Sequence, residues 1–296
     1  MIAVAGSLLA ACSGGSTGAP PGAAVQGASS LSTTRSTVVG STGRGKVPQP
    51  FARGLHTSHA RKNDVACTTV TPSADVISAL EEPGTTATAA YVIDTPSGKY
   101  TKQDYDGSEC DIAVYVAPSA NGITITDSTI HDGIRAGLVI DGASTVKVSG
   151  NDLYNVGDHN GTTYTPDGVQ YGFALMLDEA GTGETVSNNN VFDFQKDGIL
   201  AFDAVSLALT QNDVAGAGAV PYIASNGIEM DGVNFTAFTG SRSSLNQYTG
   251  SYYGASGYLV CGDTLNGSPV TMPEAKKNLA QFNDIEIYVA PNADCS

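Results

Sequence analysis

The chain has 296 residues, with 29 acidic and 14 basic side chains, 35 glycines and no tryptophan. Its hydrophobic fraction of 41% is ordinary, which excludes a chain that is disordered beyond its N-terminal region. All acidic residues lie after residue 63, where only 8 basic residues oppose them; this part has a net charge of −21 and should repel nucleic acid.

Residues 1–12 have the features of an export signal. The apolar run Ile2–Ala11 is too short to span a bilayer and is typical of the central part of a signal peptide. Leu9-Ala10-Ala11-Cys12 resembles the bacterial lipobox, whose cysteine is lipidated and becomes the new N-terminus. The resemblance implies a lipid anchor on Cys12 as the protein's contact with a membrane. Ordinary secretion is the alternative.

Residues 13–63 are rich in Ser, Thr, Gly and Pro and show no hydrophobic periodicity. Such a composition predicts a disordered linker that holds the following domain, residues 64–296, away from the envelope. The linker region carries six basic and no acidic residues, so contact with anionic lipid is a second possibility.

Four cysteines follow the linker, and an even number in an exported chain predicts disulfides. Three pairings are possible. The local choice joins Cys67 to Cys110 and Cys261 to Cys295, which would staple both ends of the domain.

The segment 73–82 predicts a short helix. Ser73 is suited to cap its N-terminus, Val76, Ile77 and Leu80 form one apolar face, and Pro83-Gly84 ends it. We expect this helix to cover the N-terminal end of the domain, ahead of first strands in 89–94 and 112–117. A last strand is expected in 282–291.

A short pattern recurs in the middle of the chain, ending each time in aspartate. The copies are GLVID (137–141), FALMLD (173–178), GILAFD (198–203) and GIEMD (227–231). Aligned on the aspartates, they place Ile140, Leu177, Phe202 and Met230 in one column, and Asp141, Asp178, Asp203 and Asp231 in the next. Repeats of this length without helices between them are typical of a solenoid.

The second half of each repeat supports this alignment. Val148, Val186 and Leu209 share a column in segments where apolar and polar residues alternate, which indicates strands. Ser128, Asn151, Asn189 and Asn212 share another, and stacked amides of this kind are expected to be structural. His131 aligns with Tyr154 and Phe192, a column that we also interpret as structural.

Together the repeats resemble the right-handed parallel β-helix superfamily, the pectate-lyase-like fold, over roughly residues 88–290. We therefore predict an all-β, right-handed parallel β-helix solenoid with a short N-terminal capping helix and a disordered N-terminal tether. The resemblance implies a polysaccharide or cell-surface glycan as partner, bound on an outer face. The sequence has none of the catalytic motifs of the family's polygalacturonases or alginate epimerases.

The aspartate column is the first candidate site. Carboxylates stacked about 4.8 Å apart repel one another unless a cation or hydrogen-bond donors intervene. Asp178 and Asp203 are therefore candidate catalytic acids or bases, and Asp141, Asp178 and Asp203 are candidate calcium ligands. The alternative is that each aspartate bonds the backbone of its own turn.

Two further groups could assist. His159 is a candidate general base, beside Asp158 as a substrate-binding residue, in an insertion over 154–172. Arg135 could pair with the aspartates and neutralise a uronate, as basic residues do in the family's lyases. Tyr252 and Tyr253 could stack on sugar rings, and the alternative, which we favour, is local packing of the loop.

We expect an exported, lipid-anchored envelope protein whose β-helix face binds or cleaves a carbohydrate, as a lyase or a hydrolase. The alternative is a structural or adhesive surface protein without catalysis. No sequence motif indicates a nucleotide cofactor, and calcium is the one ion that we consider.

Overall fold

The computed structural model describes residues 66–157, 171–216, 226–239, 241–244, 258–261, 264–265, 268–269 and 287–290. Cys12, the linker 13–63, Asp158, His159, Tyr252, Tyr253 and Cys295 lie outside these residues.

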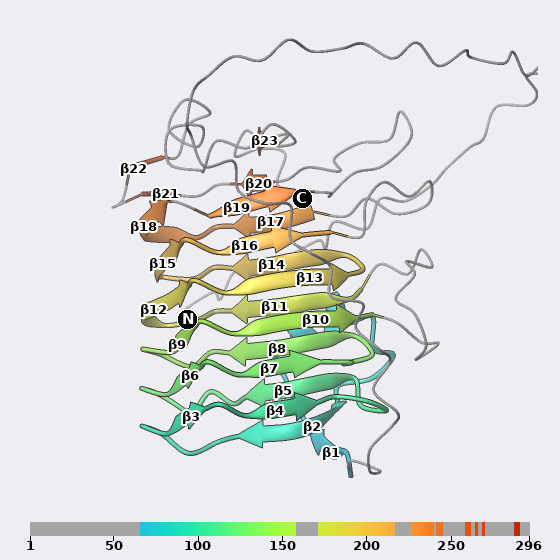
Figure 1. Cartoon of the computed structure of the whole chain (residues 1–296). Helices are drawn as coiled ribbons and strands as arrows, with labels where there is room; N and C mark the ends of the chain where they lie inside the picture. Colours follow the sequence, from blue (N-terminus) through green and yellow to red (C-terminus); the bar gives the residue numbers. More distant parts are fainter. Residues whose placement is uncertain are drawn as a thin grey trace, which may run out of the picture.

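The described chain is an all-β stack of three sheets, and the chain visits the sheets in turn (Figure 1). Sheet A contains β1 (Thr68–Val70), β2 (Ala87–Ile93), β5 (Ile112–Val116), β8 (Ala136–Asp141), β11 (Phe173–Asp178), β14 (Asp197–Phe202), β17 (Asn226–Asp231), β20 (Tyr258–Cys261) and β23 (Ile287–Ala290). Sheet B contains β3 (Lys99–Thr101), β6 (Thr124–Thr126), β9 (Lys147–Ser149), β12 (Thr182–Ser187), β15 (Ser206–Thr210), β18 (Asn234–Thr239), β21 (Thr264–Leu265) and β22 (Ser268–Pro269). Sheet C contains β4 (Asp104–Asp106), β7 (Thr129–His131), β10 (Asp152–Val156), β13 (Asn190–Phe194), β16 (Asp213–Ala215) and β19 (Arg242–Ser244).

Strands in each sheet pair in parallel, apart from the antiparallel pairs β1–β2 and β21–β22 at the ends of the stack. The predicted all-β class and stacked parallel strands are thus confirmed, and the arrangement is compatible with a β-helix. Matching residues of successive coils become neighbours in space. Ile140 pairs with Leu177, for example, and Leu177 pairs with Ala201.

That last pair corrects the sequence alignment by one residue. Phe202, not Asp203, stands beside Asp178, and Ala201 rather than Phe202 continues the inward column of Leu177. Packing sets this register, because Ile199 and Ala201 face the core next to Leu175 and Leu177. An alignment on the aspartates gives the wrong register here, because the aspartate after β14, Asp203, lies one position later than Asp178 does in β11.

Asp203 instead occupies the corner that follows the strand. The equivalent corner residues of the four coils all have a left-handed backbone: Gly142 (φ 67°), Glu179 (φ 42°), Asp203 (φ 46°) and Gly232 (φ 66°). Gly and Asp tolerate this conformation better than most residues. The position of Asp203 is therefore explained by turn geometry.

A ladder of buried amides supports the neighbouring corner, as predicted. Asn151 Nδ2 donates to Asn189 Oδ1 at 3.0 Å, and Asn189 Nδ2 donates to Asn212 Oδ1 at 2.9 Å. Each amide also bonds backbone groups of adjacent coils, for example Asn189 Nδ2 to Val148 O at 3.1 Å. These bonds satisfy backbone groups that the turn leaves unpaired inside the stack.

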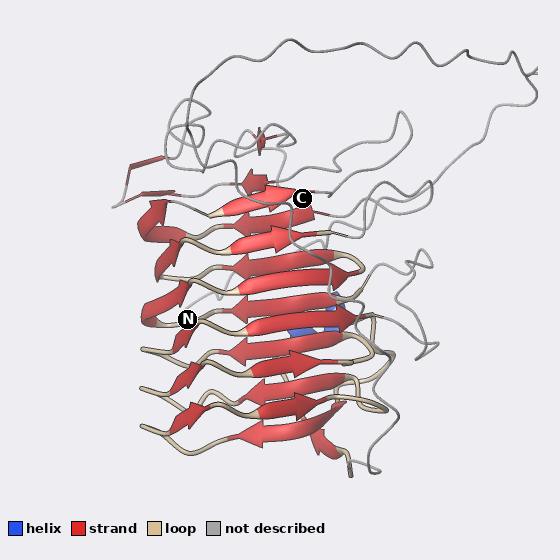
Figure 2. Cartoon of the chain, in the orientation of Figure 1, coloured by secondary structure: helices blue, strands red, loops and turns tan. Residues whose placement is uncertain are grey.

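The predicted helix forms as α1 (Ala74–Ala79), with Ser73 as its N-cap. Its position differs from the expectation. Val76, Ile77 and Leu80 pack in one cluster with residues of the outer face of sheet A, including Tyr115 and Met176, so α1 covers the side of the stack (Figure 2). The outer face of these strands is apolar, and covering it removes that surface from water. Strand β1 is the element that covers the first edge of sheet A.

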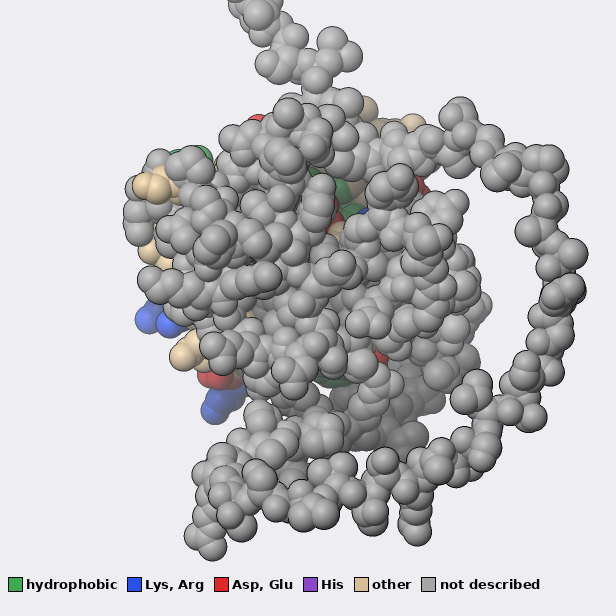
Figure 3. All heavy atoms as spheres, turned by 90° about the horizontal axis from the view of Figure 1, so that it is seen from above, with side chains coloured by type: hydrophobic (Ala, Val, Ile, Leu, Met, Phe, Trp, Pro, Cys, Tyr) green, Lys and Arg blue, Asp and Glu red, His purple; other side chains and the backbone are tan. Residues whose placement is uncertain are grey.

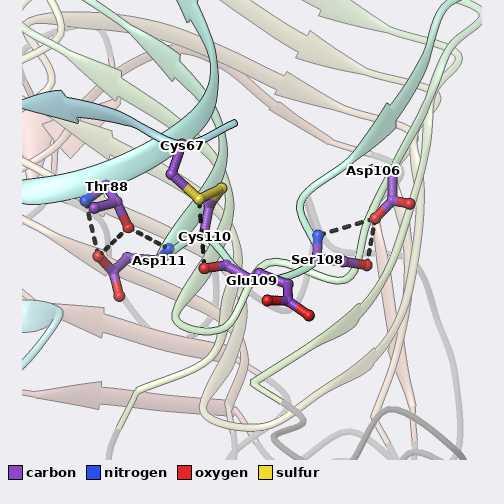
Figure 4. Close-up of a disulfide and its surroundings, with 7 residues drawn as sticks. All are labelled: Cys67, Thr88, Asp106, Ser108, Glu109, Cys110 and Asp111. Atoms are coloured by element: carbon purple, nitrogen blue, oxygen red, sulfur yellow. Dashed lines mark hydrogen bonds between the residues drawn. A yellow bond between two sulfur atoms is a disulfide. The ribbon is translucent and has the colours of Figure 1, made fainter. Parts of the chain in front are cut away.

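The Cys67–Cys110 disulfide forms as predicted and joins the segment before β1 to the segment before β5 (Figure 4). Thr88 of β2 lies close by, and its backbone N–H and its hydroxyl both donate to Asp111 Oδ2, at 2.8 and 2.5 Å. The disulfide thereby fixes the segment that leads through β1 into α1 to the second coil of the stack. Cys261 ends β20.

No helix among the described residues is long and apolar enough to cross a membrane. In the view down the stack, basic and acidic side chains lie next to one another along one edge of the described part (Figure 3).

Candidate functional site

The predicted aspartate column is only partly formed. Asp141 and Asp178 pair in register at the ends of β8 and β11, and both are buried. Ser73 bonds both: its backbone N–H donates to Asp141 Oδ2 at 3.1 Å and its hydroxyl to Asp178 Oδ2 at 2.5 Å. Tyr115 also donates to Asp141 Oδ2, at 2.6 Å. The two carboxyl groups therefore hold the N-terminal end of α1 against sheet A.

Burial raises the pKa of Asp178 to about 6. The hydrogen bond from Ser73 lowers it, and the charges of Asp141, Asp75 and Glu179 raise it further. Oδ1 of Asp178 is buried without a hydrogen-bond partner. A carboxyl group with this pKa can hold or release a proton near neutral pH, but its surroundings are those of a helix support.

Arg135 lies at the other end of α1, away from the paired aspartates. Its Nη1 donates to the carbonyl oxygens of Leu80 and Glu81, and its Nε lies 2.6 Å from Glu82 Oε1. The guanidinium also stands 4.4 Å from the ring centre of Tyr171. A cation among the last carbonyl groups of a helix stabilises its C-terminus, and Arg135 has this position.

A second carboxyl pair, which the sequence reasoning missed, lies further along the same sheet. Asp197 begins β14 and is 1% exposed, whereas Glu229 of β17 is partly exposed. Asn226, the register partner of Asp197, donates from Nδ2 to Glu229 Oε2 at 2.5 Å. The amide fixes one carboxyl group beside the other.

The pKa of Asp197 is raised well above its usual range by burial, and by the charge and hydrogen bond of Glu229. The charge of Lys196 and a hydrogen bond from Asn226 act in the opposite direction. Oδ1 of Asp197 has no hydrogen-bond partner. Two interacting carboxyl groups in unequal surroundings favour one protonated and one ionised member, which is the arrangement needed for acid–base chemistry.

The carboxyl pair has acidic neighbours. Burial raises the pKa of Asp231, at the end of β17, to about 6, and the charges of Asp203 and Glu229 raise it as well. Raised carboxyl pKa values therefore occur at two positions on this part of sheet A, Asp197 and Asp231.

A signal for the missed pair was present in the sequence. Asp197 stands in the column of Ala136 and Phe173, and Glu229 in that of Val139, Met176 and Leu200. An acidic residue in a column that is otherwise apolar indicates that this position of the coil does more than pack against its neighbours.

His131 belongs to a separate cluster on sheet C. Its ring stacks on Tyr154 at 5.2 Å, and Tyr154 stacks on Phe192 at 4.9 Å, which matches the predicted column. Nδ1 lies 2.7 Å from Asp132 Oδ2 and Nε2 lies 3.1 Å from Asp104 Oδ1. Burial lowers the pKa of His131, but the hydrogen bond and charge of Asp132, together with Asp106 and Asp104, raise it overall. Stacking hides the ring faces, so this column offers no flat surface to a sugar.

The proposed calcium ligands do not form one group, because Asp203 lies in the corner beyond the Asp141–Asp178 pair. Among the described residues, three potential ligand atoms lie within 4.8 Å of one another at Asp106, His131 and Asp132.

Comparisons of the chain with protein-family models, with curated proteins and with solved structures find no match in any of the three.

Proposed function

We propose that the chain is an envelope-anchored right-handed parallel β-helix protein of the pectate-lyase-like kind that hydrolyses a neutral polysaccharide at Asp197 and Glu229. The three-sheet order, with every third strand in the same sheet, supports the fold assignment. The pair formed by buried Asp197 and partly exposed Glu229 on the outer face of sheet A is the observation that supports the activity.

In this proposal Asp197 is the proton donor, because its surroundings favour the neutral acid. Glu229 is more exposed and is the group whose carboxylate oxygen attacks the sugar, while the proton of Asp197 goes to the leaving oxygen. Carboxyl groups in hydrogen-bond contact are nearer the roughly 5 Å separation of retaining glycosidases than the roughly 6.5–9.5 Å of inverting ones. Glu229 is therefore the proposed nucleophile of a retaining reaction.

Charge favours a neutral substrate. The chain after residue 63 carries −21, which opposes the approach of a polyuronate. The arginine that we expected to neutralise a uronate, Arg135, is engaged by Glu82 and by the end of α1. A hydrolase acting on uncharged sugars fits these features better than a lyase.

The remaining expectations extend the proposal. Lipidation at Cys12 would place the domain on the cell envelope at the end of its linker. Tyr252, Tyr253, Asp158 and His159 stay candidates for substrate contact.

A non-catalytic structural or adhesive protein is the second candidate. The observation that favours it is that Asp141, Asp178 and Arg135, three predicted site residues, bind the ends of α1 and so have a structural role.

Incubation with a panel of neutral and uronate polysaccharides distinguishes the two functions, with new reducing ends and unsaturated products measured separately. We expect reducing ends from a neutral glycan, and a loss of at least about 100-fold in Glu229→Gln and Asp197→Asn. Glu179→Gln, an exposed acid on the preceding coil, is the control and should retain activity. Retained hydrolysis in Glu229→Gln, or unsaturated products alone, would reject the proposed chemistry. Glycan binding without any cleavage would support the adhesive alternative.

A further inference from the structure

We propose that Asp106, His131 and Asp132 form a site for a divalent transition-metal cation of the Zn²⁺ type. The site lies on sheet C, at the ends of β4 and β7, and is independent of the proposed hydrolase site on sheet A. Each of the three residues offers one ligand atom, and these atoms lie within 4.8 Å of one another.

The imidazole is fixed in place before any ion binds. The side chain of His131 is only 6% exposed, and its ring lies parallel to that of Tyr154, with 7° between the planes. Fixing a ligand in this way lowers the entropy that binding has to overcome.

The second ring nitrogen of His131, Nε2, lies beside a carboxylate that is not one of the proposed ligands. Nε2 of His131 lies 3.1 Å from Asp104 Oδ1, so Asp104 can accept the Nε2 proton and leave Nδ1 as the ligand. Metal-binding histidines typically donate their second N–H to a carboxylate, which sets the tautomer and the ring orientation.

With the proton on Nε2, the lone pair of Nδ1 faces Asp132 Oδ2 at 2.7 Å. An unprotonated nitrogen and a carboxylate repel at that distance unless a positive charge lies between them. A proton or a metal ion satisfies the condition, and a metal ion also attracts the third ligand, Asp106.

Hydrogen bonds from neighbouring residues orient the carboxylates of Asp106 and Asp132. Asp106 Oδ1 accepts hydrogen bonds from Ser108 N at 2.9 Å and Ser108 Oγ at 2.5 Å (Figure 4). Asp132 accepts a hydrogen bond from Asn155 Nδ2, and Oδ1 of the same amide is buried without a hydrogen-bond partner. The amide that holds Asp132 thus keeps one oxygen without a hydrogen-bond partner.

The ligand set selects the class of metal. One imidazole nitrogen with two carboxylates suits Zn²⁺ or Mn²⁺, whereas Ca²⁺ takes oxygen ligands and gains nothing from the imidazole. We therefore expect Zn²⁺ to bind and Ca²⁺ not to compete at similar concentration.

Titration of the tag-free full chain with ZnCl₂, followed by calorimetry, tests the site, with the d–d absorption of bound Co²⁺ as a second readout. His131→Phe is the sharpest variant, because Phe192 shows that a phenyl ring fits this column. His159→Phe is its control, since it removes another of the four histidines. Asp104→Asn tests the outer carboxylate.

We expect one Zn²⁺ per chain, with loss of that binding in His131→Phe and unchanged binding in His159→Phe. Asp104→Asn should weaken Zn²⁺ binding by about 10–100-fold. Absence of binding to the wild-type chain would overturn the proposal. Equal affinity in His131→Phe would do so too. If His131→Phe does not fold, unchanged affinity in Asp132→Asn is the outcome that rejects the site.

Discussion

The hydroxyl of Ser73 lies 2.5 Å from Oδ2 of Asp178, although 105 residues separate them in the chain. The same hydroxyl accepts the backbone N–H of Val76 and so caps α1. One side chain thus caps the N-terminus of the helix and ties it to the fourth coil of the stack, at the end of β11. This contact joins the N-terminal segment to a carboxyl group whose pKa is raised by burial.

Removing this hydroxyl should release the helix. Ser73→Ala leaves an uncapped helix and a buried Asp178 with fewer donors, so we expect a loss of about 1–3 kcal/mol in the free energy of unfolding. Urea unfolding measures it. Ser78→Ala, at an exposed position of α1, is the control and should change the stability by under about 0.5 kcal/mol. Equal effects of the two changes would contradict the capping role.

The raised pKa of Glu184 leads us to expect that the stability of the protein falls as the pH rises. Glu184 is 1% exposed and pairs in register with Leu207, which is fully buried in the core. Burial raises its pKa to about 7 from an ordinary 4.5, while hydrogen bonds from its own backbone and from Thr145 N–H lower it. Below pH 4.5 the group is protonated in both the folded and the unfolded state. As the pH rises to 7 and above, the unfolded state ionises more readily, so this group costs roughly 3 kcal/mol of folding stability.

Glu184→Gln should remove this dependence. Urea unfolding at pH 5 and pH 8 should show the wild-type chain losing more stability than the variant between the two values. At pH 8 the variant should be the more stable protein. Glu179→Gln, exposed on the same coil, should keep the wild-type dependence. A Glu184→Gln variant with an unchanged pH profile would refute the buried-acid explanation.

The disulfide should contribute strongly to stability, because Cys67 and Cys110 are 43 positions apart in the chain. Closing a loop of this length is expected to stabilise the folded protein by on the order of 4 kcal/mol through the entropy of the unfolded chain. The double variant Cys67→Ser with Cys110→Ser should therefore unfold at a clearly lower temperature. Adding reductant should lower the melting temperature of the wild type towards that of the double variant. A wild type insensitive to reductant would argue against the loop-closure effect.

The amide ladder predicts a contrast between two adjacent residues. Asn189 is buried and bonds Asn151, Asn212 and Val148, so Asn189→Ala leaves several buried groups unpaired and should cost about 2–5 kcal/mol. Asn190→Ala removes a partly exposed side chain that donates to Asp152 at 3.2 Å and should cost under about 1 kcal/mol. Chemical denaturation of both variants measures the difference. Similar losses would show that the ladder adds no special stability.

Much of the fold was predictable because each coil repeats the same local pattern. The pairing of Val148 with Val186, the amide ladder and the His131–Tyr154–Phe192 column follow directly from matching positions in the repeats. The N-cap Ser73 was also predictable, since capping depends on residues within one turn of helix. The Cys67–Cys110 bond belongs to the local one of the three pairings that the sequence allowed.

The candidate site was less predictable because its properties depend on neighbours from other coils. Asp197 and Glu229 are 32 positions apart, and neither resembles a known motif. Their importance comes from burial and from mutual contact, which arise only when β14 and β17 lie side by side. Arg135 likewise lies just before the first copy of the aspartate pattern in the sequence, but in the structure it binds the C-terminal end of α1.

The sequence by itself determined the periodic strands, their parallel stacking and the residues that form ladders, because these depend on local alternation repeated at each coil. Only the tertiary structure decided that Asp203 turns a corner, that α1 lies on the side of sheet A, and that Glu184 is buried in the core. Register and the degree of burial are set by contacts between coils. A carboxyl group in the sequence therefore becomes a support, a turn residue or an acid according to what the next coil places against it.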